Sequence, residues 1–159
     1  MNERADSTSV NRVGLRSGSV SEFTVIVPFR PGGADRLRAV LASQGGRFEL
    51  ADRVGSVHDM RFTIIENDTK LLFATTYDGD WDSYINDFAT KIPEALDRLF
   101  SDVVGWPGIT SPNVKDFIAD HQVTASAWYC AYPDASVADI RRGQRTLTAF
   151  EHLLDAASR

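Results

Sequence analysis

Two stretches in the middle of the chain, one with alternating apolar and polar residues and one rich in β-forming residues, predict two strands of one hairpin. Residues 58–65 have the period of two that a half-buried strand requires, and residues 70–77 are rich in β-forming side chains. The sequence Glu66-Asn67-Asp68 between them is a turn signal. After the second strand, Gly79 can take a positive φ, and Asp78 or Asp80 can cap the helix that follows.

The longest amphipathic pattern begins near Trp81. Apolar residues recur there every three or four positions, namely Trp81, Tyr84, Ile85, Phe88, Ile92, Leu96, Leu99 and Phe100. Pro93 lies inside this pattern, and a proline removes one backbone hydrogen bond and clashes with the preceding turn. The pattern therefore predicts a long helix that is kinked or split at Pro93.

Further elements are expected on both sides of this unit. Residues 21–30 alternate as a first strand, with Pro28 at its exit or at an edge, and residues 34–43 have the apolar stripe of a helix. A short helix is predicted over 114–121 and a last strand over 123–132. A basic helix follows from Ser136 to Arg145 or on to Ala157. Its apolar residues are expected to face inward: Ile140, Leu147, Phe150, Leu153 and Leu154.

This order contains the strand-helix-strand-strand-helix-strand core of the split βαβ, or ferredoxin-like, arrangement. We therefore expect an α+β fold in which an antiparallel sheet has helices on one face and extra helices follow at the C-terminus. The other face of the sheet needs a cover. The predicted last strand places Trp128, Cys130 and Tyr132 there, which suggests a lined cavity closed by a partner subunit or by the extra helices.

Composition indicates a globular protein with a small-molecule ligand. The chain has 159 residues, 43% hydrophobic and 25% charged, so we expect one domain over 21–159 after a mobile tail over 1–20. A strand over 11–15 is the alternative for the tail, which lacks the apolar core of a secretory signal. The net charge of -5 gives no electrostatic reason to expect binding to nucleic acid or membrane. A single cysteine suits a cytoplasmic location.

Several ordered motifs resemble a family of uncharacterised bacterial proteins. The chain reads HDMRF at 58–62, LFATTYDG at 72–79, SYINDF at 83–88, and HQVT at 121–124 followed by WYCAYP at 128–133. The family's motifs are of the types IHFARW, LLFxSNYDGSxExYxDDF, GYP and HQVxTxxWYxAYP. Roughly residues 57–142 are covered. The chain departs from the pattern at Asp59-Met60 and at Trp106, which replaces a tyrosine, so we expect a different pocket shape.

The resemblance implies a ferredoxin-like fold related in architecture to the dimeric α+β barrels. Those barrels include haem enzymes, such as chlorite dismutases and dye-decolourising peroxidases, and cofactor-free monooxygenases and cyclases. By this analogy we expect a homodimer, and a cofactor-independent acid-base or oxygenative reaction on an aromatic or polyketide-like substrate. A non-catalytic dimerisation or partner-binding module and a haem-binding redox protein are the alternatives.

Histidines are the strongest candidates for chemistry. A neutral imidazole at His58 could be a general base or a haem ligand, and the alternative is a structural histidine bonded to Asp78. Arg61 would lie on the opposite face of a regular strand. His121 ends the short helix, where a helix cap competes with ligation. No spacing of ligands predicts a metal site.

Aromatic residues could complete a ligand site. Trp106, Trp128 and Tyr132 could stack on a planar ligand, and core packing is the alternative for each. Cys130 is expected to be buried and unreactive. We therefore predict a cleft in which His58 is catalytic. The expected ligand-binding residues are Arg61, Asp78, Trp106, His121, Trp128 and Tyr132.

Overall fold

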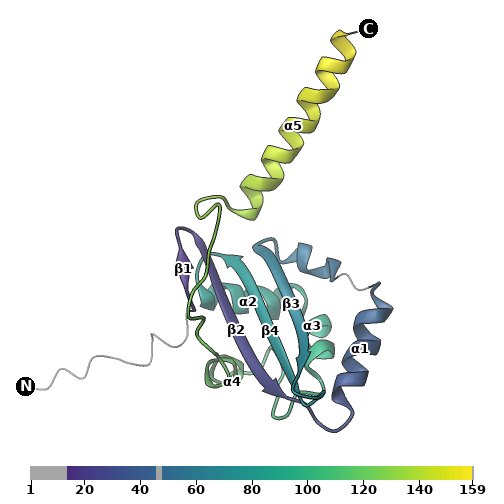
Figure 1. Ribbon diagram of the computed structural model, residues 1–159, viewed down its shortest axis with the longest axis vertical. Helices are drawn as coiled ribbons and strands as arrows, with labels where there is room; N and C mark the ends of the chain where they lie inside the picture. The colour runs from purple at the N-terminus through teal and green to yellow at the C-terminus, as the bar shows by residue number, and fades with distance from the viewer. Residues whose placement is uncertain (1–13, 46–47, 159) are drawn as a thin grey trace, which may run out of the picture.

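A computed structural model describes residues 14–45 and 48–158 of the chain (Figure 1). Its sheet has four strands in the order β1-β2-β4-β3, all antiparallel to their neighbours. The strands are β1 (Arg16–Ser17), β2 (Val20–Pro28), β3 (Val57–Ile65) and β4 (Lys70–Asp78). The helices are α1 (Gly33–Ser43), the short 3-10 helix η2 (Glu49–Arg53), α2 (Trp81–Lys91), α3 (Pro93–Phe100), α4 (Val114–Asp120) and α5 (Val137–Ala157). The predicted α+β class, with a four-stranded antiparallel sheet and helices on one face, is confirmed.

The core lies between the sheet and helices α2 and α3, which cover one face of it (Figure 1). Residues of one parity on β2, including Phe23 and Val25, are buried on this face, and Phe73 stands opposite Val25 in the register. The alternation that predicted β2 therefore marks its buried face correctly. The aromatic rings of Tyr77 and Tyr84 stack with centroids 3.9 Å apart, which joins the end of β4 to α2.

The hairpin of β3 and β4 agrees with the alternating pattern. All three residues of the predicted turn signal, Glu66, Asn67 and Asp68, have positive φ angles, of 50°, 51° and 66°. Asn and Asp tolerate this left-handed region better than most side chains, which explains why the turn forms here. Each strand extends one residue beyond the predicted range, to Val57 and Asp78.

The long amphipathic pattern is split at the predicted proline. Helix α2 ends at Lys91, and Pro93 opens α3 at a position where its missing N–H leaves no helical hydrogen bond unmade. Gly79 has a φ of 87°, and Asp80 caps α2 by accepting a hydrogen bond of 2.8 Å from the Ser83 N–H. Of the two predicted caps for this helix, Asp80 is the correct one.

The predicted strand over 123–132 is wrong. Only Gln122 makes a bridge to β2, opposite Val25, and the Val123 N–H donates to the Thr24 carbonyl at 2.9 Å. The rest of the segment leaves the sheet because β1 already occupies the edge of β2 beyond that point, with Ser17 opposite Val20. A strand edge offers one row of hydrogen-bonding groups. At β2, strand β1 pairs with one part of this row and residues 122–123 pair with another part.

The first residues of the sheet lie within the predicted tail. Residues 14–20 are part of a hairpin whose strand β1 pairs with the start of β2, so the domain begins earlier than residue 21. The remainder of the predicted tail, over 1–13, lies outside the described residues, and with it most of the alternative strand over 11–15.

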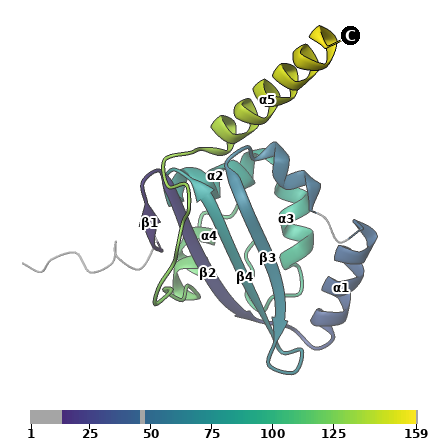
Figure 2. The same ribbon diagram turned by 45° about the horizontal axis from the view of Figure 1, so that its top comes forward.

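Helix α5 is continuous to Ala157 and extends away from the sheet and its helices (Figures 1 and 2). The expectation that its apolar residues face inward is wrong. Ile140, Leu147, Phe150, Leu153 and Leu154 are all exposed. The helical periodicity in the sequence identified the stripe, but periodicity alone does not say which surface a stripe packs against.

We expect Asp80→Ala to lower the free energy of unfolding at neutral pH by about 1 kcal/mol, because a lost N-cap leaves a helical N–H unpaired. The N–H and hydroxyl of Ser83 both donate to Asp80 and hold the pKa of its carboxyl below the usual value. This stabilisation is therefore present above the unfolded-state pKa, of about 3.9, and is lost as the pH falls through the lower folded-state pKa. Urea unfolding at neutral and acidic pH measures both effects.

Asp80→Asn is the matched control, because asparagine caps helices as well as aspartate does but does not titrate. It should keep most of the stability at neutral pH. An equal loss in Asp80→Asn and Asp80→Ala would contradict a capping role and would point to charge alone.

Candidate ligand-binding cleft

A cleft of about 220 Å³ lies on the face of the sheet opposite α2 and α3. Its floor comes from β2, β3 and β4, where Val20 and Thr76 have the parity opposite to that of the core residues. Its wall comes from the segment that left the sheet and from the start of α5. The lining residues are Val20, His58, Asp59, Thr76, Trp128, Tyr129, Cys130, Ala131, Tyr132 and Ile140.

A β-bulge places His58 in this cleft. The register passes from Val57 opposite Tyr77 to Asp59 opposite Thr76, so His58 is an extra residue in the strand. A bulge re-aims the side chains beside it, and here His58 and Asp59, neighbours in sequence, both line the cleft. The strand is therefore not regular at this point. The expectation that His58 and Arg61 lie on opposite faces assumed that it was.

The Asp78 carboxylate is hydrogen-bonded to His58 and fixes the orientation of its ring. Its Oδ1 lies 2.7 Å from Nε2 of His58, and both side chains are less than one-fifth exposed, at 18% and 19%. An ionised carboxylate only accepts hydrogen bonds, so the His58 Nε2 carries the proton and Nδ1 of a neutral ring keeps its lone pair. The structural contact between His58 and Asp78 that the sequence suggested as an alternative is therefore present, and it orients a possible base.

The same carboxylate also binds the start of α5. Oδ2 of Asp78 accepts a hydrogen bond of 2.9 Å from the Val137 N–H, in the first turn of the helix. A negative charge at that end of a helix is favourable because the helix dipole is positive there. Ser136 and Asp139 complete a capping box at the same end. Asp78 thus joins the histidine of the cleft to α5.

Three aromatic side chains stand on the outer wall of the cleft. Trp128 is partly exposed, whereas Tyr129 and Tyr132 are 85% and 74% exposed. The wall is fixed at one end by the Pro133 carbonyl, which accepts a hydrogen bond of 2.9 Å from the Ser19 N–H. Rings that are exposed beside a cleft are available to a ligand, in contrast to rings packed in a core.

Cys130 also lines the cleft and is only partly buried. The expectation that it is a buried strand residue is wrong, because the strand that would have buried it does not form. Asp59 and Thr76 were not predicted as cleft residues either; a hydrogen bond joins the Thr76 hydroxyl to the Asp59 carboxylate. The sequence offered no signal for Asp59, since its position depends on the bulge in β3, whereas the parity of Thr76 within β4 could have placed it on this face.

Four predicted site residues lie outside the cleft lining: Asp78, which contacts His58 of the lining, and Trp106, His121 and Arg61. The Trp106 indole donates to Asp97 at 2.9 Å, and its ring stacks on Phe100 in the core. His121 bonds through Nδ1 to the Phe117 carbonyl at 2.8 Å, which is the helix-cap role that the sequence suggested. The Arg61 side chain is 69% exposed and lies 3.8 Å from Asp59, near the cleft but not in its lining.

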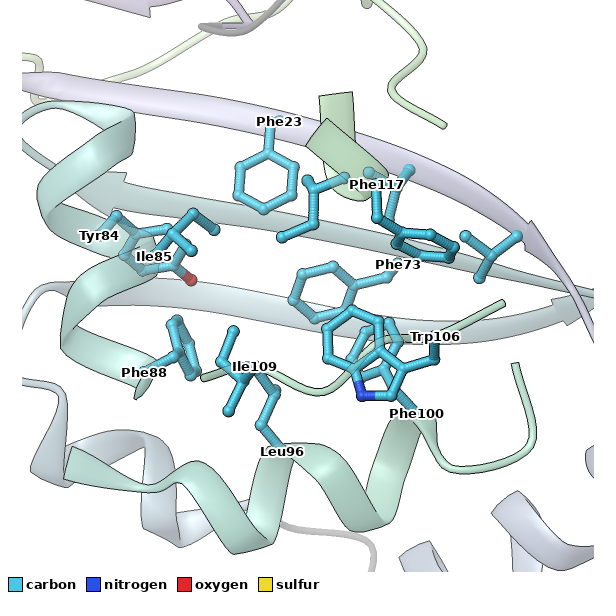
Figure 3. Close-up of a pocket in the computed structure, with 13 residues that line it drawn as sticks. Phe23, Phe73, Tyr84, Ile85, Phe88, Leu96, Phe100, Trp106, Ile109 and Phe117 are labelled. Atoms are coloured by element: carbon cyan, nitrogen blue, oxygen red, sulfur yellow. The ribbon is translucent and has the colours of Figure 1, made fainter. Parts of the chain in front are cut away.

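A second cavity lies inside the core, between the sheet and α2 and α3 (Figure 3). Its volume is about 30 Å³, and aromatic and aliphatic side chains such as Phe23, Phe73 and Phe88 surround it. The Tyr84 hydroxyl is hydrogen-bonded to Thr75 at 2.5 Å, and burial raises the pKa of this phenol. The space is close to that of one water molecule, so it does not hold an organic ligand without rearrangement.

The two histidines proposed for haem do not meet in one site. His58 lines the cleft with its Nε2 bonded to Asp78, whereas His121 caps α4 with its Nδ1 bonded to a carbonyl. These residues do not fit a haem site with two histidine ligands. Within the described residues there is also no group of three or more metal-ligating side chains, and no helix long and apolar enough to cross a membrane.

No protein-family model and no curated protein matches the chain. Among solved structures, the chain is similar to tetracenomycin F2 cyclase from Streptomyces glaucescens, which is described as a type-II polyketide cyclase. The sequence identity is 13% and the TM-score is 0.39, over 69% of this chain and 97% of the cyclase. A similarity at this level supports no conclusion about the cleft or its chemistry.

We expect Asp78→Ala to release the first turn of α5. A hydrogen bond to a charged group contributes about 1.5–3 kcal/mol, so the exchange of the Val137 amide hydrogen should accelerate by about tenfold or more. Hydrogen exchange followed by NMR measures this directly. His58→Ala keeps the Asp78 carboxylate and should leave the Val137 amide protected; equal acceleration in both variants would contradict a direct bond.

Proposed function

We propose that the cleft binds a small molecule and that His58 acts in it as a general base. The observation that supports this most directly is the hydrogen bond of 2.7 Å between His58, on the cleft floor, and Asp78. A histidine whose one nitrogen is held by a carboxylate presents the other nitrogen in a fixed direction and stabilises the imidazolium that forms on protonation. The geometry of the pair is therefore suited to proton transfer.

The proposed substrate is a planar aromatic or polyketide-like molecule. Trp128, Tyr129 and Tyr132 offer ring surfaces beside the cleft, and Thr76 and Asp59 offer polar groups on its floor. A few polar groups within an otherwise apolar and aromatic lining are typical of small-molecule sites. The family resemblance adds the expectation of a cofactor-independent reaction, of the acid-base or the oxygenative kind.

In the acid-base form of the reaction, the substrate presents a C–H bond next to carbonyl groups. His58 takes that proton, the bonding electron pair moves into the carbonyl system as an enolate, and Asp78 stabilises the imidazolium. The enolate carbon can then attack a second carbonyl of the same molecule, and His58 returns the proton to the resulting alkoxide. No external oxidant or reductant is needed for this sequence.

The test uses 2-acetyl-1-tetralone, a bicyclic aromatic 1,3-diketone, as the probe. We expect the protein to accelerate exchange of its acidic C–H with deuterium oxide, as followed by NMR. His58→Ala should lower the protein-dependent rate by about 10²-fold, the lower end of the range for a positioned general base.

His121→Ala is the matched control, because His121 is the helix cap and does not line the cleft. It should leave the exchange rate unchanged. Equal rates for the wild-type protein and His58→Ala would refute the role of His58. Amide chemical shifts on addition of the probe report binding separately, and shifts confined to residues outside the cleft lining would refute the site itself.

A non-catalytic dimerisation module is the second candidate, and the uncovered face of the sheet favours it. Ile26, Leu72 and Thr63 form one row across β2, β4 and β3 on that face, and none of them is fully buried. In this alternative to the catalytic function, a second copy would cover this face. If so, Thr63→Glu should produce monomers in size-exclusion chromatography with light scattering, and an unchanged mass would exclude the sheet face as the interface.

Three expectations stay predictions from the sequence: the cytoplasmic location, membership of the bacterial family, and a small molecule as the ligand. The cleft, of about 220 Å³, lies below the roughly 300–1,000 Å³ of typical small-molecule sites, so the proposed ligand is a compact molecule. The net charge of -5 gives nucleic acid no electrostatic attraction.

A further inference from the structure

Helix α5 carries an apolar stripe that no other part of the described chain covers. Ile140, Leu147, Phe150 and Leu154 are exposed by 39%, 58%, 54% and 50%. They recur at the first and fourth positions of a seven-residue repeat, the spacing of a seam between paired helices. An exposed row of this kind on one helix face marks an interaction surface.

The start of α5 is fixed, so the stripe is presented in a defined direction. Asp78 and the capping box hold the first turn, and Arg141 forms an ion pair of 2.6 Å with Asp52 of η2. From there the helix leads away from the sheet (Figure 2). Its 21 residues span about 30 Å, and the stripe runs along most of that length.

We propose that two copies of this chain associate by antiparallel pairing of their α5 helices. In antiparallel helix pairs, each first-position residue faces a fourth-position residue of the other helix. A register centred between Thr148 and Ala149 then places Leu147 against Phe150 of the partner subunit. The inference is independent of the small-molecule proposal.

The sizes of the side chains favour this arrangement. The same register places Gly143 against Leu154 of the partner subunit, and Ile140 against Ala157 of the partner subunit, so each small residue faces a large one. A Cβ atom added at Gly143 would meet nothing within 4 Å in this chain, so the glycine leaves open space on the stripe. Seams pack well where large and small residues alternate across them.

A parallel pair would pack poorly. It would place Gly143 against Gly143 of the partner subunit and Phe150 against Phe150 of the partner subunit, which leaves a void at one level and crowding at the next. Antiparallel packing avoids both faults with the same residues.

The charges of α5 favour the same orientation. Its first half is basic, with Arg141, Arg142 and Arg145, and its second half is acidic, with Glu151 and Asp155. Antiparallel pairing sets the basic half of each helix level with the acidic half of the other, whereas parallel pairing sets arginines level with arginines. Apart from Glu151, these charges lie at repeat positions away from the seam, so they favour the antiparallel orientation only through long-range charge complementarity.

The pairing has a consequence for the cleft. Ile140 both begins the stripe and lines the cleft, so the end of the partner's helix would lie beside the cleft opening. A parallel pair would place that end far from it, because α5 points away from the domain.

The first experiment measures the mass of the full chain by size-exclusion chromatography with light scattering, from micromolar to near-millimolar concentration. We expect a dimer, and we expect Leu147→Glu to weaken it by about 100-fold or more, since pairing would bring two like charges into the seam. Thr148→Glu adds the same charge outside the seam and should leave the dimer intact. A monomeric wild-type protein would overturn the proposal, and so would a dimer that Leu147→Glu leaves unchanged but Thr63→Glu dissociates.

The second experiment tests orientation by disulfide cross-linking in a Cys130→Ser background, which removes the one natural cysteine. We expect Gly143→Cys mixed with Leu154→Cys to form a covalent dimer on oxidation, because the register brings these positions face to face. Each variant alone should stay monomeric under denaturing conditions. Efficient cross-linking of each variant with itself, and none beyond that in the mixture, would show parallel pairing and refute the antiparallel one.

Discussion

The free edge of β2 is the constraint on which the rest of the structure depends. β1 pairs with one part of this edge and Gln122-Val123 with another, so no continuous strand can form beyond them. Residues 123–132, which would complete a regular ferredoxin-like sheet, instead pass over the face of the sheet opposite α2 and α3. There they form the irregular wall of the cleft. Without that displacement Trp128 would be a strand residue, and the cleft would have no outer side.

Local rules in the sequence predict most of the scaffold. The alternation of β2 and of the β3–β4 hairpin, the split at Pro93 and the cap at Asp80 depend on contacts between near neighbours, and all of them agree with the structure. In each case backbone sterics or a short-range hydrogen bond determines the outcome, and a single sequence contains that information.

The predictions that are wrong depend on contacts between segments that are distant in the sequence. The segment over 123–132 has strong β propensity, but propensity gives way when another segment takes the hydrogen-bonding edge. The α5 stripe was identified correctly, while its direction depends on a docking surface that periodicity does not encode. The residues of the predicted site show the same difference between local and distant contacts. His58 and Asp78, close in the hairpin, come together, whereas Trp106 and His121 do not reach the cleft.

The two oxygens of the Asp78 carboxylate make different hydrogen bonds, one with His58 and the other with the first turn of α5. Because both contacts use one side chain, a displacement of the first turn of α5 would move the carboxylate that orients the His58 ring. One side chain thus ties the geometry of the cleft to the orientation of a helix that extends away from it.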